Sequence, residues 1–235
     1  MRNKQPRISV IIPAYNEQGY IEDCLESLDK QTFRDFETIV IDSGHDNTSR
    51  IARKHKTKVI KYVKNGPAAA RNIGAENSRG DILVFADADC RFDADFLHRI
   101  NQKFEKPIGG GICQLSVYDY DRKSDAIMYE MINTITKALI AMRFIVTSGS
   151  CFVYDRKAFF NAKGFNAKLY TNEDHDLARR VGKQKRFEVF DNITVQTSSR
   201  RLKKWGIFKT ARIYTKSALL YFLSNKPLME YWDNI

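Results

Sequence analysis

The sequence has little of what marks a secreted, membrane-spanning or metal-clustered protein. Its four cysteines include no CxxC pair and stand beside no histidine at metal-ligand spacing, so neither a zinc cluster nor a redox dithiol is indicated. No stretch approaches the ~18 uninterrupted apolar residues of a spanning helix, and the first residues hold no apolar run of signal-peptide length. We therefore expect free thiols and a cytoplasmic protein.

Proline and glycine are scattered rather than gathered into linkers. The 5 prolines and 12 glycines mark no boundary, and the chain contains no internal repeat or low-complexity tract. Its 235 residues, 43% hydrophobic and 29% charged, suit a folded protein rather than a disordered, collagen-like or disulfide-scaffold one. We expect a single domain over residues 1–235.

Acidic residues are outnumbered by basic ones. Asp and Glu total 28 against 39 Lys and Arg, which gives a formal net charge of +11. Such a charge implies an anionic partner, whether a nucleic acid, a phosphorylated substrate or an acidic membrane, and does not choose among them. A basic nucleic-acid-binding module, whose acidic pairs serve only as helix caps, is the alternative from another functional class.

Short apolar runs alternate with helical patterns, which predicts an α/β fold with parallel strands joined by crossover helices. The expected strands cover residues 8–12, 36–41, 59–63, 82–86, 109–117 and 148–153. The expected helices cover residues 20–28, 48–55, 67–77 and 125–142. Polar turns follow the strands, and the carboxyl ends of parallel strands share one edge of a sheet, so we expect these turns to meet at one crevice.

The strongest local signal is an Asp-x-Asp pair, Asp87 and Asp89, directly after an apolar strand. Carboxylate oxygens are ligands that Mg²⁺ or Mn²⁺ prefers, and such a cation can bridge to a diphosphate. A turn or capping motif explains the same two residues, because Asp is common at such positions. Taken alone, the pair therefore leaves a metal site and a structural turn open.

Four motifs together resemble family 2 glycosyltransferases of the GT-A fold. They are Pro13-Ala14-Tyr15-Asn16-Glu17, then Asp42, then Ala70-Arg71-Asn72-Ile73-Gly74, then Asp87-Ala88-Asp89. The resemblance implies a Rossmann-like, mostly parallel central sheet flanked by helices. It implies a nucleotide-diphospho-sugar donor and Mn²⁺ or Mg²⁺ on Asp89 and Asp87. It places Asp42 and Arg71 at the nucleobase, with uracil slightly preferred over guanine, and it lines the donor pocket with Pro13, Ala14, Tyr15, Glu17, Asp87 and Ala88.

A Glu-Asp pair, Glu173 and Asp174, resembles a further motif of that family and precedes a helix that runs to about residue 182. By that resemblance Asp174 is the catalytic base, because inverting transfer needs a carboxylate to take the acceptor hydroxyl's proton. The alternative is an acidic first turn that offsets the helix dipole. Further candidates for contact with the acceptor or the diphosphate are Glu173, His175, Gly149, Ser150, Arg200 and Arg201.

The C-terminal segment is basic, with no Asp or Glu from residue 192 to residue 229. If residues 206–223 form a helix, this basic amphipathic extension suits an anionic membrane interface. A terminal helix docked on the core is the alternative. The apolar side of the helix would hold Ile207, Ala211, Tyr214, Ala218 and Tyr221, flanked by Phe208, Leu219 and Phe222, with Lys209, Arg212 and Lys216 elsewhere.

We therefore expect a metal-dependent, inverting glycosyltransferase that moves a sugar to a hydroxyl of a glycan or lipid-linked acceptor at the inner face of the membrane. Residues 1–90 would be its nucleotide-binding half, residues 91–198 its acceptor-binding half and residues 199–235 its basic helical tail. A polyprenyl-phosphate sugar synthase is the alternative enzyme, because a phosphate acceptor is already ionised and needs no base. No nucleic-acid partner is expected on this interpretation.

Overall fold

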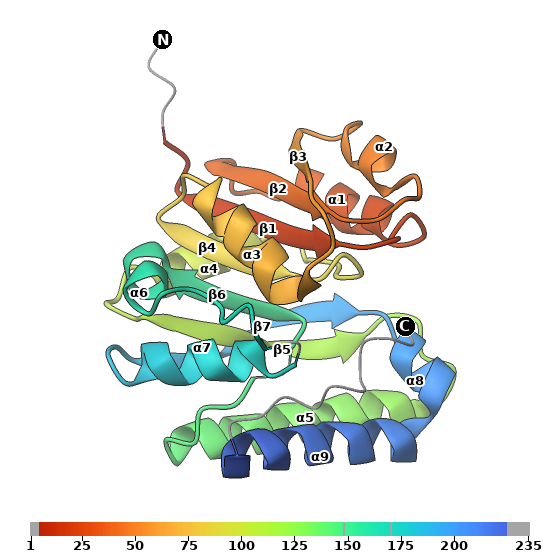
Figure 1. Cartoon of the computed structure of the whole chain (residues 1–235), viewed down its shortest axis with the longest axis vertical. Helices are drawn as coiled ribbons and strands as arrows, with labels where there is room; N and C mark the ends of the chain where they lie inside the picture. Colours follow the sequence, from red (N-terminus) through yellow and green to blue (C-terminus); the bar gives the residue numbers. More distant parts are fainter. Residues whose placement is uncertain (1–4, 148, 170, 225–235) are drawn as a thin grey trace.

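The computed structural model describes residues 5–147, 149–169 and 171–224, which form one seven-stranded sheet with helices on its faces (Figure 1). The strand order is β3-β2-β1-β4-β6-β5-β7. The strands are β1 (Ile8–Ala14), β2 (Phe36–Asp42), β3 (Thr57–Lys61), β4 (Ile82–Ala86), β5 (Gly110–Val117), β6 (Cys151–Asp155) and β7 (Phe187–Thr197). The helices are α1 (Ile21–Asp29), α2 (Thr48–Ala52), α3 (Gly66–Glu76), α4 (Phe96–Lys103), α5 (Lys123–Ala141), α6 (Arg156–Asn161), α7 (Glu173–Gly182), α8 (Arg200–Trp205) and α9 (Ile207–Ser224).

The first four strands run in parallel, so their carboxyl ends share one edge of the sheet. β1 pairs with β2 and β4, and Ala14 at the end of β1 lies opposite Asp42 at the end of β2. Alternate side chains of β1 pack on opposite faces: Val10 joins the core cluster under α1, while Ile11 joins the cluster under α3. A Cβ on Gly74 would lie 2.3 Å from Ile11 Cγ2, so a glycine at this position lets α3 lie close against β1.

β6 is the reversed strand of the sheet. It runs antiparallel to both β4 and β5, and Cys151 at its start lies opposite Ala86 at the end of β4. The Asp87 backbone N–H donates to the Ser150 carbonyl at 3.0 Å. The segment before β6 therefore lies beside the Asp87 turn, at the edge where the parallel strands end.

The predicted α/β fold with a mostly parallel sheet is confirmed, and its elements differ from the sequence expectation in detail. β3 begins and ends two residues earlier than expected, and α2 ends at Ala52 rather than at residue 55. The expected strand 148–153 begins only at Cys151, because Gly149 has φ +88, which no strand residue adopts; residue 148 itself lies outside the described residues. α4, α6 and β7 were not expected. All four cysteines are buried and free, as predicted.

α5 and α9 lie side by side at the end of the molecule away from β3 (Figure 1). The predicted C-terminal helix is confirmed as α9, which follows α8 after Gly206 at φ +74. Ile207 is half-buried and Ala211 is exposed, while Lys209, Arg212 and Lys216 are exposed as predicted. The side chains of Tyr214, Ala218, Leu219, Tyr221 and Phe222 lie outside the described residues. Within the described part of the chain, no helix is both long and apolar enough to cross a membrane.

Candidate active site

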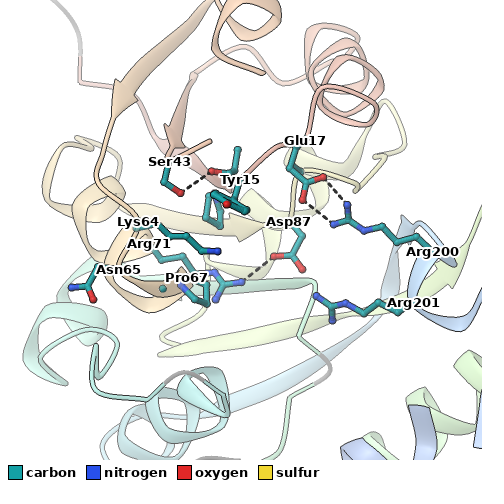
Figure 2. A pocket seen from close by; sticks show the side chains of 15 residues that line it. Tyr15, Glu17, Ser43, Lys64, Asn65, Pro67, Arg71, Asp87, Arg200 and Arg201 are labelled. Atoms are coloured by element: carbon teal, nitrogen blue, oxygen red, sulfur yellow. Dashed lines mark hydrogen bonds and ion pairs between the residues drawn. The ribbon is translucent and has the colours of Figure 1, made fainter. Parts of the chain in front are cut away.

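A cavity of about 350 Å³ opens at the edge of the sheet where β1 and β4 end (Figure 2). We call it the first cavity. It is lined by the turns after β1, β2 and β4, by the connection from β3 into the first half of α3, and by the start of α8. Seven of the residues predicted to bind a donor are in its wall, namely Pro13, Ala14, Tyr15, Glu17, Arg71, Asp87 and Ala88, together with Arg200 and Arg201.

Arg200 ties the C-terminal part of the chain to the acidic wall of the first cavity. Its two terminal nitrogens donate to the two carboxylate oxygens of Glu17, at 2.7 and 3.0 Å (Figure 2), and its Nε lies 3.0 Å from Asp89 Oδ2. Burial raises the pKa of Glu17 and of Asp89, and the neighbouring acids raise both pKa values further. Arg200 lowers both pKa values but does not outweigh these effects. Arg200 therefore neutralises two carboxylates that would otherwise repel each other.

Asp42 does not line the first cavity. Its carboxylate is fully buried at the end of β2, where it accepts from the Gly44 N–H and the Lys61 ammonium, each at 2.8 Å, and from the Ser49 hydroxyl. These contacts hold the turn from β2 to α2 in place. Its predicted contact with a nucleobase stays a prediction.

Arg71 is a buried cation between two carboxylates. Its side chain is only 5% exposed; Nη2 donates to Asp87 Oδ1 at 2.9 Å and Nη1 donates to Glu173 Oε1 at 2.6 Å. The guanidinium lies 5.0 Å from the centre of the Phe152 ring. Burial and the neighbouring Asp174 carboxylate raise the pKa of Glu173 to about 7, against the opposing effect of Arg71. The Arg71 guanidinium thus bridges the turn after β4 and the start of α7, and its predicted contact with a nucleobase stays a prediction.

A second cavity, of about 330 Å³, adjoins the first. Its wall comes from α5, the segment before β6, the start of α7, and α9. Arg71, Asp87 and Arg201 line both cavities. Two ligands placed in the two cavities would therefore meet at these three side chains.

Asp174 lines the second cavity at the start of α7 and is held by a network of hydrogen bonds. The Thr147 hydroxyl donates to Asp174 Oδ2 at 2.6 Å, and the His175 backbone N–H donates to Oδ1 at 2.9 Å. Burial alone would raise the pKa of Asp174, but His175, Thr147 and Arg71 outweigh burial and lower it. Asp174 is therefore an ionised carboxylate at neutral pH.

His175 and Gly149 complete the surroundings of Asp174. The Thr147 backbone N–H donates to His175 Nδ1 at 3.0 Å, and the Thr147 hydroxyl lies 2.6 Å from the same nitrogen. Gly149 lies against the carboxylate, since a Cβ there would be 3.9 Å from Asp174 Oδ2. Glu173, Asp174, His175 and Gly149 therefore share the second cavity, while Ser150 lies beside Asp89 in a small adjoining pocket; their predicted contact with the acceptor or the diphosphate stays a prediction.

Asp87 and Asp89 provide the chemistry that a divalent cation needs. Both are carboxylates at the carboxyl end of β4, and Mn²⁺ and Mg²⁺ prefer hard oxygen ligands. Across the residues that the structure describes, no group of three or more acidic, histidine or cysteine side chains could hold a metal ion. The two carboxylates would supply only part of the oxygen ligands of such a cation, and they do not by themselves form a complete protein site; Asp87 also pairs with Arg71, and Asp89 with Arg200.

Sequence comparison assigns the family. A family model described as glycosyl transferase family 2 matches residues 9–160, well over half of the chain. The chain belongs to glycosyl transferase family 2. Curated relatives match over a shorter region. Glycosyltransferase AglE of Haloferax volcanii is 40% identical over 108 residues, which are 42% of this chain and 36% of AglE. The uncharacterized glycosyltransferase EpsJ of Bacillus subtilis is 33% identical over 107 residues, which are 43% of this chain and 31% of EpsJ. The matched region is thus about a third of each relative.

Solved structures share the fold of this chain. The S. aureus TarS fragment 1–349 in complex with UDP superposes with a TM-score of 0.65 at 20% identity, covering 82% of this chain and 60% of that one. The mannosyltransferase PcManGT from Pyrobaculum calidifontis, in complex with GDP-Man and Mn²⁺, gives a TM-score of 0.65 at 18% identity, covering 92% of this chain and 65% of that one. At these identities the likeness shows the fold alone.

Several residues that line the two cavities were not identified from the sequence. Ser43, Lys64, Asn65 and Pro67 line the first cavity, and Thr147 lines the second. The Asn65-Gly66-Pro67 turn follows the third strand at the same edge as the other turns, and that position was the signal that could have found it. No comparable signal marks Thr147, because its role depends on the fold that brings it to Asp174.

Proposed function

We propose that this chain transfers a sugar, with inversion, from a nucleoside diphosphate sugar in the first cavity to an acceptor hydroxyl in the second. The observation that carries the proposal is the shared boundary of the two cavities at Arg71, Asp87 and Arg201, with Asp174 on the acceptor side. A donor whose diphosphate lies by Asp87 would present its anomeric carbon to that boundary. In this proposal residues 1–90 form the nucleotide-binding half and residues 91–198 the acceptor-binding half.

In this mechanism Asp174 takes the proton of the acceptor hydroxyl as that oxygen attacks the anomeric carbon. Its lowered pKa keeps it ionised, and the Thr147 hydroxyl fixes the orientation of its carboxylate. Arg200 and Arg201 offer positive charge beside the departing diphosphate. No covalent intermediate is required.

Asp87 and Asp89 would hold a Mn²⁺ or Mg²⁺ ion against the donor diphosphate. A divalent cation there would act as a Lewis acid that stabilises the negative charge of the leaving nucleoside diphosphate. The Mn²⁺ and GDP-Man in PcManGT and the UDP-GlcNAc bound to TarS support this choice of cation and donor class. We propose UDP as the first nucleotide to test and GDP as the second.

Nucleotide binding is the first test. Thermal unfolding would be followed with UDP, GDP, UDP-GlcNAc and GDP-Man, each with and without Mn²⁺. A ligand at a hundredfold excess over Kd stabilises the folded state by about 2.7 kcal/mol. We expect metal-dependent stabilisation by one nucleotide, its loss in Asp89→Asn, and its retention in the exposed control Asp81→Asn. If none of the four nucleotides stabilises the protein against thermal unfolding, the proposal that the first cavity binds the donor is wrong.

The acid–base role is tested separately with Asp174→Asn. Removal of a general base costs about 10² to 10⁴ in turnover, while nucleotide binding in the other cavity should persist. If turnover survives in Asp174→Asn, the acceptor is already ionised. That outcome would favour the polyprenyl-phosphate sugar synthase over transfer to a hydroxyl.

A further inference from the structure

Apolar side chains gather on the outer side of α5 and directly after it. Ten large hydrophobic residues are exposed in the described part of the chain, and five of them fall between residues 127 and 144. Monomeric proteins rarely leave apolar groups clustered in this way without a binding role. We call this set the α5 stripe; its members, each 54 to 60% exposed, are Ile127, Met131, Ile135, Met142 and Phe144.

The α5 stripe continues into the second cavity. Ile127, Met131 and Ile135 recur every four residues and so lie on one face of the helix. Ile132 and Leu139 lie on the adjacent face and line the second cavity. Ile135 belongs to both surfaces, because it lines the cavity while being 54% exposed. An apolar track therefore leads from the surface of the molecule into the cavity.

That track ends at the proposed reaction site. The second cavity has Ile132, Leu139 and Val146 along one wall and Asp174 in the same enclosure. Hydroxyl groups placed against these three apolar side chains would be buried without partners at a cost, whereas polar side chains of the same cavity, such as Thr136 and Asn172, can bind a polar group. A molecule with an apolar chain and a polar head matches both ends of the track.

The charge beside the α5 stripe identifies the surface from which such a molecule would come. α9 and α5 both line the second cavity, and the exposed side chains of α9 include Lys209, Arg212 and Lys216 together with Phe208, which is 92% exposed. No acidic residue occurs from residue 192 to residue 229. Exposed apolar groups flanked by basic residues suit an anionic lipid surface, whereas two copies of this face brought together would oppose like charges.

We propose that the acceptor is carried on a lipid chain in an anionic membrane, that the α5 stripe docks on the membrane and guides this chain, and that its polar head reaches Asp174. The proposal rests on the proposed function and names the acceptor class. It assigns the membrane contact to α5 as well as to the basic C-terminal helix. The apolar side chains insert into the membrane, and Lys209, Arg212 and Lys216 make the binding selective for anionic lipids.

Vesicle binding tests the docking surface. The full chain would be sedimented with vesicles of phosphatidylcholine alone and of phosphatidylcholine with phosphatidylglycerol. We expect binding to the anionic vesicles, and a loss of affinity of about tenfold or more in Ile127→Asp/Met131→Asp. The control is Val63→Asp, which places one aspartate, half the charge added by the double variant, at a residue that is 86% exposed on the connection after β3. It should bind like the wild type.

Two results would overturn the docking proposal. Binding that is equal in the double variant and the wild type, and lost only with added salt, would assign the membrane contact to the basic residues alone. A wild-type dimer that becomes a monomer in the double variant, without vesicle binding by either, would show that a second copy covers the α5 stripe. Sedimentation equilibrium over a range of protein concentrations gives that second readout.

Transfer of labelled sugar tests the acceptor class. Anionic vesicles would carry either a polyprenyl phosphate or a polyprenyl-diphosphate-linked sugar, with UDP-GlcNAc and GDP-Man as labelled donors. We expect label in the solvent-extractable lipid for one probe, with a loss of about tenfold in Ile127→Asp/Met131→Asp and none in Val63→Asp. Thermal stabilisation by nucleotide should be unchanged in both variants. Nucleotide binding with no effect of the stripe variants refutes this inference alone, whereas absence of nucleotide binding refutes the proposed function.

Discussion

Arg71 and Glu173, far apart in the sequence, form a buried ion pair with 2.6 Å between Nη1 and Oε1. The pair joins α3, beside the first cavity, to the start of α7, which carries Asp174. Arg71 also binds Asp87, so one guanidinium connects the carboxylate at the end of β4 to the helix of the proposed base. The relative position of the two cavities therefore depends on this cation.

Glu173 should make the stability of the fold depend on pH. Its pKa is about 7 in the folded protein and 4.5 as the ordinary value, so between these the folded state keeps a proton that the unfolded chain has lost. The free energy of unfolding should therefore fall as pH rises through this window, by up to about 3 kcal/mol. Denaturant unfolding of Glu173→Gln should show a flatter decline than the wild type. An unchanged decline would contradict the prediction.

We predict that Thr147 positions Asp174 and does not itself contact the substrate. Thr147→Val removes the hydroxyl bonded to Asp174 Oδ2, so the pKa of Asp174 should rise. The acidic limb of the pH–rate profile should then move to higher pH, and turnover should fall by about tenfold. Thr147→Ser, which keeps the hydroxyl, should restore both. A valine variant with reduced turnover but an unshifted profile would limit Thr147 to a structural role.

Gly149 should resist substitution because of its backbone conformation. Its φ of +88 is rare for residues with a side chain, although a Cβ there would meet no atom closer than 3.9 Å. Gly149→Ala should therefore lower the free energy of unfolding by about 1 to 2 kcal/mol through backbone strain. Gly19→Ala is the control, since a Cβ at residue 19 meets no atom within 4 Å and should change stability by less than about 0.5 kcal/mol. Equal effects in urea unfolding would refute the argument.

Arg200 should stabilise the fold through its contacts with Glu17 and Asp89. Arg200→Gln leaves Glu17 and Asp89 close together without their shared cation. We expect the free energy of unfolding to fall by about 2 kcal/mol or more. Arg50→Gln, at an exposed position on α2, is the control and should have little effect. If both variants unfold at the same denaturant concentration, the Arg200 contacts contribute no net stability.

The parallel half of the sheet could be predicted because its strands are uninterrupted apolar runs. β7 was missed because its pattern is broken by a bulge: Cys113 pairs with Phe190, but Gln114 pairs with Thr194, so residues 191–193 have no partner on β5. Asp191 and Asn192 are exposed there and read in the sequence as a turn. α6 is only six residues long and gives no periodic signal.

Site residues in motifs at the ends of predicted elements could be identified from the sequence, whereas contacts between distant segments could not. Asp87 and Asp174 line cavities in positions that their motifs indicated. No sequence pattern shows that Arg71 turns to Glu173, or that Arg200 reaches Glu17, because each pair forms only when distant segments pack. The buried Asp42 carboxylate likewise accepts from Lys61 of β3, a residue that lies outside the motifs that pointed to Asp42.

The order of the two cavities along the chain has an evolutionary consequence. Apart from Arg200 and Arg201, the wall of the first cavity is encoded before Asp89, and that of the second cavity is encoded almost entirely after it. Recombination within the α4 segment could therefore exchange one wall and preserve the other, provided that Arg71 still finds an acid at the position of Glu173. One inherited donor module could in this way acquire new acceptors without rebuilding its nucleotide pocket.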